Sequence, residues 1–362
     1  MLKLEAMVRD DKIFDSCSVF GMMNKAGKRF SGQDVIKATV NMQERTNGLG
    51  GGFAVYGLYP QFRDNFALHI MYLIKDAISP VEEFLKSNFK VILKEEIPTK
   101  PLSSITNPPL LWRYFLDVAE DKKDKEEDYV VEKVMTINTG FKGAFVFSSG
   151  KNMGVFKGVG LPKDIAKFFC LENYQGYLWL GHGRFPTNTP GWWGGAHPFN
   201  ILDWSVIHNG ELSSYGINVR CLTSYGYQST LQTDTEVIAY AADLLMRKHK
   251  LPIELAAYVL AAPLWDEIER SNPAKRALLR TLRQVYGSLL LNGPFSVIIA
   301  NRKVMIGLTD RIKLRPLTAG VKGETVYLSS EESAIHLVCN DLEKSWTLEA
   351  GKPVVARLEG KS

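Results

Sequence analysis

The chain has 362 residues, the length of about two average domains or of one large one. Hydrophobic residues make up 45% and charged residues 23% of it, which is a globular composition and excludes a disordered or fibrous protein. Lys and Arg total 44 against 39 Asp and Glu, a formal net charge of +5. Both signs are spread along the chain, so nucleic acid is not an expected partner.

Neither a membrane nor a secretory route is predicted. The longest apolar stretch, residues 251–265, contains two prolines and a glutamate and is shorter than the roughly 18 to 20 residues of a membrane helix. The first 16 residues carry scattered acids and no apolar core, unlike a signal peptide. The four cysteines have no C-x-x-C spacing. We therefore expect a cytoplasmic protein with reduced cysteines.

The first third of the chain is predicted to alternate strands and helices. Ser79-Pro80-Val81-Glu82 has the pattern of a capping box with proline at the first helical position. The predicted strands are 18–24, 53–59, 67–74, 90–97 and 110–118, and the predicted helices are 32–44 and 79–88.

A β-α-β insertion is predicted at about 60–135. Residues 120–128, EDKKDKEED, are charged throughout and carry both signs, which is typical of a solvated loop or exposed helix. We interpret this block as the tip of the insertion, whose role the sequence leaves open.

The remaining chain is predicted to place a helical middle between strands. Because strands occur near both ends, we expect the terminal strands to share a sheet in one mixed domain. The predicted strands are 143–160, 176–185, 295–301, 304–308, 325–329 and 354–358, and the predicted helices are 162–170, 233–250, 252–261 and 273–289.

The sequence contains neither a nucleotide loop nor a zinc motif that we can identify. The glycine-rich segment 47–52 precedes a predicted strand, lacks the Rossmann spacing and has no following Lys-Ser or Lys-Thr. The six histidines include no H-x-x-x-H pair and no cysteine at ligand spacing. We therefore expect no metal and no cofactor in this chain.

Several polar motifs are candidates for chemistry, although each also has a structural explanation. Cys17 directly precedes an apolar strand, where a cysteine is most often a small core residue. His208-Asn209-Gly210-Glu211 follows an apolar strand, and Asn-Gly is usually a tight turn. Thr233-Asp234-Thr235-Glu236 fits a capping box, where an aspartate complements the helix dipole.

The order of these motifs is more informative than any one of them. Cys17 is followed by Arg45, then by GHGRFPTNTPGWWGGAHPFNILDWSVIHNGEL with Arg184, and then by Asp234. This series resembles the class II, N-terminal-nucleophile glutamine amidotransferases, and looks closest to the amidotransferase domain of glutamate synthases. Segments 309–317 and 327–331 also resemble the family's closing strands. The resemblance spans about 17–335, with gaps. The predicted insertion at about 60–135 carries no sequence motif of the family that we can match.

The resemblance implies an α+β fold, the four-layer αββα sandwich of N-terminal-nucleophile hydrolases, over 17–362. It also implies site roles, because attack on an amide favours a thiolate nucleophile, an oxyanion needs aimed donors, and an amino-acid zwitterion needs a guanidinium and a carboxylate. The implied catalytic residues are Cys17, Asn209 and Gly210, and the implied substrate-binding residues are Arg45, Arg184, Thr187, His208 and Asp234. Among the latter, Arg184 is assigned the substrate carboxylate, Asp234 the ammonium, and Arg45 the support of Cys17 and its loop.

In this family the free α-amino group of the nucleophile serves as the base, which requires removal of residues 1–16 as a propeptide. The alternative is that this leader is simply a disordered start.

The function implied is hydrolysis of glutamine to glutamate and ammonia through a thioester on Cys17. After the closing strands we expect no room for a synthase barrel of roughly 250 residues, so a separate glutamate-synthase-like subunit, which could carry flavin and iron–sulfur clusters, is the expected partner in a hetero-oligomer. Two alternatives remain open: an unprocessed, catalytically silent regulatory or scaffold subunit, and an N-terminal-nucleophile hydrolase acting on another amide.

Overall fold

The computed structural model describes residues 16–186 and 191–359. Two predictions lie outside these residues: the leader, except for Ser16, and the substrate-binding role of Thr187.

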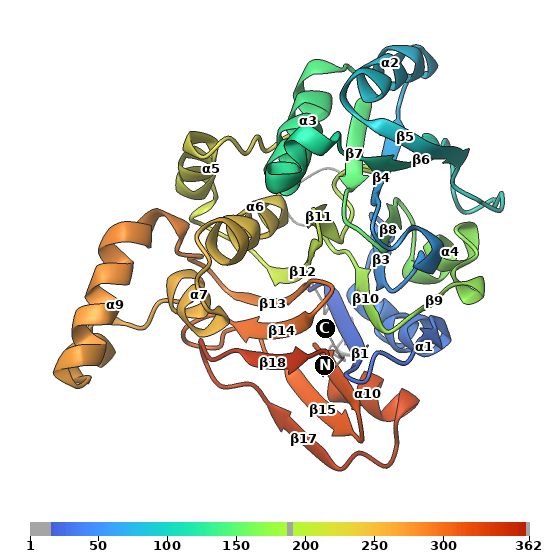
Figure 1. The fold of residues 1–362 in the computed structure, drawn as a ribbon. Helices are drawn as coiled ribbons and strands as arrows, with labels where there is room; N and C mark the ends of the chain where they lie inside the picture. The colour runs from blue at the N-terminus through green and yellow to red at the C-terminus, as the bar shows by residue number, and fades with distance from the viewer. Residues whose placement is uncertain (1–15, 187–190, 360–362) are drawn as a thin grey trace, which may run out of the picture.

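Two antiparallel sheets stacked face to face form the centre of the molecule (Figure 1). The larger sheet comprises, in order, β17 (Lys344–Thr347), β15 (Thr318–Lys322), β16 (Thr325–Ser329), β1 (Ser18–Asn24), β10 (Leu178–Gly183), β3 (Gly51–Tyr56) and β8 (Met153–Gly158). The smaller sheet comprises β11 (Phe199–Ile201), β12 (Trp204–Gly210), β13 (Phe295–Ala300), β14 (Val304–Thr309) and β18 (Val354–Arg357). The pairing of β1 with β16 confirms that strands from the two ends of the chain share a sheet.

Helices cover the outer face of each sheet. The larger sheet is covered by α1 (Gln33–Asn41), α4 (Pro162–Phe168) and α10 (Glu332–Val338). On the smaller sheet, α6 (Asp234–Ala242) packs directly on β11 and β12, and α5 (Tyr215–Ser224) packs against α6. Farther out, α9 (Pro273–Tyr286) contacts both α7 (Ile253–Leu260) and α8 (Trp265–Arg270). The four layers are therefore helix, sheet, sheet and helix, as predicted.

The central strands are buried on both faces, which explains why the sequence shows apolar runs rather than alternation. Every residue of β1 except Asn24 is buried. A side chain at Gly21 would bring its Cβ within 2.8 Å of the Met305 sulfur on the facing sheet. Glycine at this position therefore lets the two sheets approach closely at the middle of β1.

The predicted insertion contributes a further antiparallel sheet beside the sandwich. Its strand order is β5 (Lys90–Glu96), β6 (Leu110–Asp117), β4 (Phe66–Tyr72) and β7 (Ala144–Ser148). Helices α2 (Ile78–Asn88) and α3 (Glu126–Gly140) pack on β5 and β7. Strand β7 lies beyond the predicted boundary at 135.

Some predicted boundaries were wrong for identifiable reasons. Helix α2 begins at Ile78 after a 3-10 turn, Lys75–Ala77, and has no side-chain cap, so the predicted capping box does not form. Helix α3 was not predicted because its first turn, Glu126 to Asp128, belongs to the charged block that was interpreted as a solvated loop or exposed helix at the tip of the insertion. Helices α5, α8 and α10 were also missed; at seven and six residues, α10 and α8 are too short to show a helical period.

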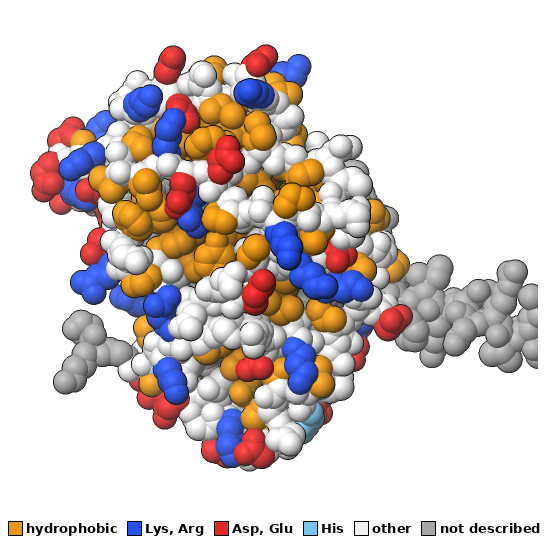
Figure 2. Space-filling view, turned by 90° about the vertical axis from the view of Figure 1, so that its right-hand side faces the viewer, with side chains coloured by type: hydrophobic (Ala, Val, Ile, Leu, Met, Phe, Trp, Pro, Cys, Tyr) orange, Lys and Arg blue, Asp and Glu red, His pale blue; other side chains and the backbone are white. Residues whose placement is uncertain are grey.

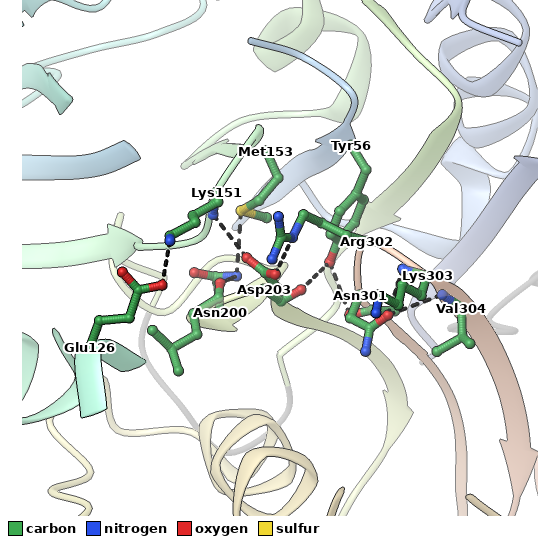
Figure 3. A network of polar contacts seen from close by, with 12 residues as sticks. Tyr56, Glu126, Lys151, Met153, Asn200, Asp203, Asn301, Arg302, Lys303 and Val304 are labelled. Atoms are coloured by element: carbon green, nitrogen blue, oxygen red, sulfur yellow. Dashed lines mark hydrogen bonds and ion pairs between the residues drawn. The ribbon is translucent and has the colours of Figure 1, made fainter. Parts of the chain in front are cut away.

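A polar network fastens the hairpin turn between β11 and β12 to its neighbours (Figure 3). The Asp203 carboxylate accepts the backbone N–H of Lys151 at 2.8 Å and forms an ion pair with Arg302. The hydroxyl of Tyr56 lies 2.9 Å from the Asp203 carbonyl oxygen. The turn at one end of β12 is thus anchored to both sheets, which helps to fix the position of the strand whose other end carries His208 to Gly210.

Figure 2 shows one face of the molecule, on which basic and acidic side chains are interspersed among apolar ones. On this face the described side chains do not form a continuous basic surface of the kind that binds nucleic acid. Within the described residues, the structure contains no helix with the length and apolar character that crossing a bilayer demands.

Replacement of Asp203 by alanine is expected to destabilise the fold. The Lys151 N–H and the Arg302 guanidinium would lose a partner, which costs about 1 to 3 kcal/mol of unfolding free energy. Urea unfolding measures the change. Asp64→Ala is the matched control, because Asp64 is 84% exposed; equal midpoints for the two variants would contradict the expectation.

Candidate active site

The start of β1 opens into a cavity of about 330 Å³ at the edge of the two sheets. Its walls come from the residue before β1, the segment after β10, the end of β12 and the turn that leads into α6. The lining residues are Cys17, Arg184, Phe185, Pro186, His197, His208, Gly210, Glu211, Leu212, Tyr215, Gln232, Thr233, Asp234 and Thr235. Among the described residues, the structure thus brings together five predicted site residues: Cys17, Arg184, His208, Gly210 and Asp234.

Cys17 presents its thiol to this cavity and is half-buried. Its position follows from the pairing of β1 with β10, in which Ser18 lies opposite Gly183. The backbone N–H of Phe185 points at the sulfur, at 3.3 Å. Burial raises the pKa of the Cys17 thiol to about 11, although the Phe185 N–H and the Arg184 charge act in the other direction. In the uncleaved chain the thiol is therefore protonated at neutral pH.

Charges of opposite sign face the cavity from two elements. Arg184 follows β10 and is 3% exposed, and guanidinium remains charged in proteins. Asp234 opens α6, where its Oδ2 accepts the Leu212 N–H at 3.0 Å. Burial alone would raise the pKa of Asp234, but the His208 ring and the Leu212 N–H hold it below the usual value. The cavity therefore carries a fixed cation and a fixed anion.

Three histidines and a threonine form a closed ring of contacts beside the cavity. Oγ1 of Thr235 lies 3.1 Å from Nδ1 of His208 and 2.7 Å from Nε2 of His197. The His197 ring stacks on that of His182, with centroids 3.9 Å apart, and Nε2 of His182 donates to the His208 carbonyl oxygen at 3.0 Å.

Burial lowers the pKa of His182 to about 3 and holds that of His197 well below its usual value. Both rings are therefore neutral at pH 7. This closed set of contacts also holds the imidazole of His208, whose Nδ1 lies 3.6 Å from the Asp234 carboxylate.

The end of β12 supplies the two predicted oxyanion residues in different ways. Gly210 lines the cavity, and a Cβ there would lie 2.0 Å from the Pro294 carbonyl oxygen, so only glycine fits. Asn209 lies outside the cavity wall, on the face of β12 opposite His208. Its side chain is buried, and neither amide atom has a partner among the described residues.

Arg45 does not line the cavity. It ends the 3-10 turn Gln43–Arg45, where its Nη1 lies 2.6 Å from Oε1 of Glu331 and its Nη2 donates to the hydroxyl of Ser16. Its contacts are thus with the residue preceding Cys17 and not with the cavity. The predicted support of the Cys17 loop by Arg45 stays a prediction, and the structure gives Arg45 no contact with the cavity.

Several cavity residues were not predicted from the sequence. His197 and Thr235 lie within segments that the sequence singled out, but no spacing relates them, because their contact joins the loop before β11 to the start of α6. Tyr215 and Gln232 come from regions without any recognisable motif. Among the described residues, no group of three or more His, Cys, Asp or Glu side chains is arranged to hold a metal ion.

Comparison with known proteins gives the same assignment as the sequence motifs. A family model described as class II glutamine amidotransferases matches residues 74–230. This range includes Arg184 and His208 to Gly210, but neither Cys17 nor Asp234.

Three similar proteins differ in how much of their length is matched. An uncharacterised protein of Archaeoglobus fulgidus is 53% identical over 361 residues, covering 98% of this chain and 96% of that protein. An amidophosphoribosyltransferase of Methanocaldococcus jannaschii is 28% identical, covering 54% of this chain and 37% of that one. The glutamate synthase [NADPH] large chain of Bacillus subtilis is 24% identical, covering 69% of this chain and 18% of that one. Because the family model matches residues 74–230, the chain contains a class II glutamine amidotransferase domain.

Proposed function

We propose that this chain hydrolyses the side-chain amide of glutamine to glutamate and ammonia. The observation that carries the proposal is the shared cavity of Cys17, Arg184 and Asp234. A nucleophile, a cation and an anion around one cavity complement an amino acid that also carries a reactive amide. In this proposal Arg184 binds the α-carboxylate and Asp234 binds the α-ammonium.

The reaction proceeds in two steps. The Cys17 sulfur attacks the amide carbon, the amide nitrogen leaves as ammonia after it gains a proton, and a thioester remains. Water then adds to the thioester, which releases glutamate and restores the thiol. In this proposal the backbone N–H of Gly210 and the side-chain amide of Asn209 stabilise the oxyanion in each step. The Asn209 amide is buried without a partner among the described residues, and it does not line the cavity as Gly210 does.

The thiol needs a base, since its pKa is raised to about 11 in the uncleaved chain. Removal of residues 1–16 would free the α-amino group of Cys17, whose unperturbed pKa is about 7.7 to 8.0. The proposal therefore includes cleavage of the leader. The contact of Arg45 with Ser16 supports a role for Arg45 in holding the chain at this position.

The ammonia is proposed to pass to a separate synthase subunit. The match to the glutamate synthase large chain, which covers only 18% of that protein, supports a glutamate-synthase-like partner. In this proposal the chain itself needs no metal or cofactor, and any flavin or iron–sulfur cluster belongs to the partner.

A second candidate is a catalytically silent scaffold or regulatory subunit that keeps its leader. In that candidate Cys17 is a poor nucleophile, because with the leader attached burial raises the pKa of its thiol to about 11 and no α-amino group is free to act as base.

The intact mass of the purified protein, with and without a glutamine-like chloroketone, distinguishes the two candidates. We expect a mass lacking residues 1–16 and one adduct on Cys17. Cys17→Ala should keep its leader and take no adduct. A full-length wild-type mass without an adduct would instead favour the scaffold.

Replacement of either charged cavity residue is expected to impair glutamine turnover selectively. Loss of a buried charge pair to substrate costs about 3 kcal/mol, so Arg184→Ala and Asp234→Asn should each lower kcat/KM for glutamine about a hundredfold. Steady-state ammonia release measures the effect, with Asp64→Asn as the exposed control. If hydrolysis of a simple amide without amino-acid charges fell equally, the proposed substrate contacts would be wrong.

The proposed partner predicts a hetero-oligomer. We expect the tagged chain to co-purify from its native host with a larger subunit of the synthase type, identified by mass spectrometry. Recovery of the free monomer alone, at low and high ionic strength, would count against a stable partner. That result would not bear on glutamine hydrolysis, which the kinetics of Arg184→Ala and Asp234→Asn test separately.

A further inference from the structure

A single buried carboxylate holds the turn that leads into α6. Glu236 is 1% exposed. Its Oε1 accepts the Thr230 N–H at 3.0 Å, and its Oε2 accepts the Leu231 N–H at 2.9 Å. The Tyr240 hydroxyl donates to Oε1 at 2.8 Å. Both carboxylate oxygens are therefore engaged.

These bonds differ from the capping box predicted at residues 233–236. In that motif the third helical residue bonds to the N–H of the N-cap residue itself. Thr233 does cap the helix, accepting the Thr235 N–H at 3.2 Å. Glu236 instead accepts the N–H groups of Thr230 and Leu231, which precede Thr233 by three and two residues. The carboxylate thus fastens the turn that precedes the helix.

The turn that Glu236 holds, residues 230–233, forms part of the wall of the cavity. Gln232 and Thr233 line the cavity and lead directly to Asp234. Gln232 has a φ of 60°, a left-handed conformation that is unfavourable for residues other than glycine. Such a conformation persists only where the surrounding structure supports it. The bonds from Glu236 to the two residues before Gln232 supply that support.

We propose that Glu236 is a positioning residue for the substrate, which keeps Gln232 in the cavity wall and aims Asp234 at the ammonium group of the bound amino acid. Glu236 does not line the cavity, so it acts through the turn. The inference rests on the proposed function, because the ammonium contact of Asp234 belongs to it.

Charged and titratable groups from three elements face Glu236. Lys157 of β8 is buried, its Nζ donates to the Gly194 carbonyl oxygen at 2.9 Å, and burial lowers its pKa to about 7 against the opposing charge of Glu236. Tyr215 of α5 and Tyr240 of α6 are the phenols whose pKa values the Glu236 charge raises.

Burial raises the pKa of Glu236 to about 7, although its N–H partners and Lys157 oppose the change. A proton on either carboxylate oxygen of Glu236 would point toward an N–H or O–H that already donates to that oxygen. Protonation therefore weakens the hydrogen bonds from Thr230 and Leu231 to Glu236. We therefore expect KM for glutamine to rise as the pH falls below 7.

Steady-state kinetics of Glu236 variants test the proposal. Glu236→Ala should raise KM for glutamine about tenfold, which corresponds to one charge-assisted hydrogen bond, with kcat within about threefold of wild type because the nucleophile is untouched. The KM of Glu236→Gln should lie between those of wild type and Glu236→Ala, since the glutamine amide oxygen still accepts an N–H. This variant should also lose the rise of KM below pH 7. Glu254→Gln, an exposed acid in the first turn of α7, is the matched control.

Hydrogen exchange supplies a measurement that needs no activity. The amides of Thr230 and Leu231 should exchange faster in Glu236→Ala than in wild type, and not in Glu254→Gln. If wild type does not hydrolyse glutamine, the proposed function fails, but hydrogen exchange still reports whether Glu236 holds the Thr230 and Leu231 amides. If glutamine is hydrolysed, a wild-type KM in either folded Glu236 variant, or a fall in kcat alone, would overturn the positioning role.

Discussion

The register between β1 and β10 is the constraint on which the site depends. Ser18, the first residue of β1, pairs with Gly183, the last residue of β10. Cys17, just before β1, and Arg184, just after β10, therefore meet at the same edge of the sheet. The Phe185 N–H then reaches the sulfur at 3.3 Å. A shift by one residue would turn the thiol to the opposite face of the sheet. The buried residues on both faces of β1 make such a shift costly.

The facing sheet and α6 complete the cavity around this edge. Strand β12 brings Gly210 to the cavity and is anchored at its other end by Asp203. Helix α6 brings Asp234, which is held between the His208 ring and the Leu212 N–H. The contacts of three histidines with Thr235 and with one another join β10, β12 and α6, and two of them, His182 and His197, are neutral. The fixed charges of the cavity therefore rest on a hydrogen-bonded support, which is how a preorganised site limits reorganisation.

The fold was well predicted where local patterns are strong and poorly predicted where burial decides. Strand 325–329 was predicted with its observed bounds, because an apolar run between polar turns marks a buried strand. Helix α3 was missed because charged residues fill its first turn, while its packing against β7 depends on the tertiary structure. The Ser79 motif has the form of a cap, yet the helix starts earlier, within a turn that the tertiary structure imposes.

For the site, the sequence by itself determined which chemistry is present: a cysteine ahead of a strand, an arginine after another, and Asn-Gly and Thr-Asp-Thr-Glu segments in an order typical of one family. Such motifs are local, so they can be recognised without a structure. Only the tertiary structure decided that Arg45 contacts Ser16 outside the cavity, that Asn209 is buried without a partner among the described residues, and that Glu236 binds the preceding turn. These contacts depend on strand pairing and burial between segments far apart in the chain or on backbone geometry, neither of which residue order specifies.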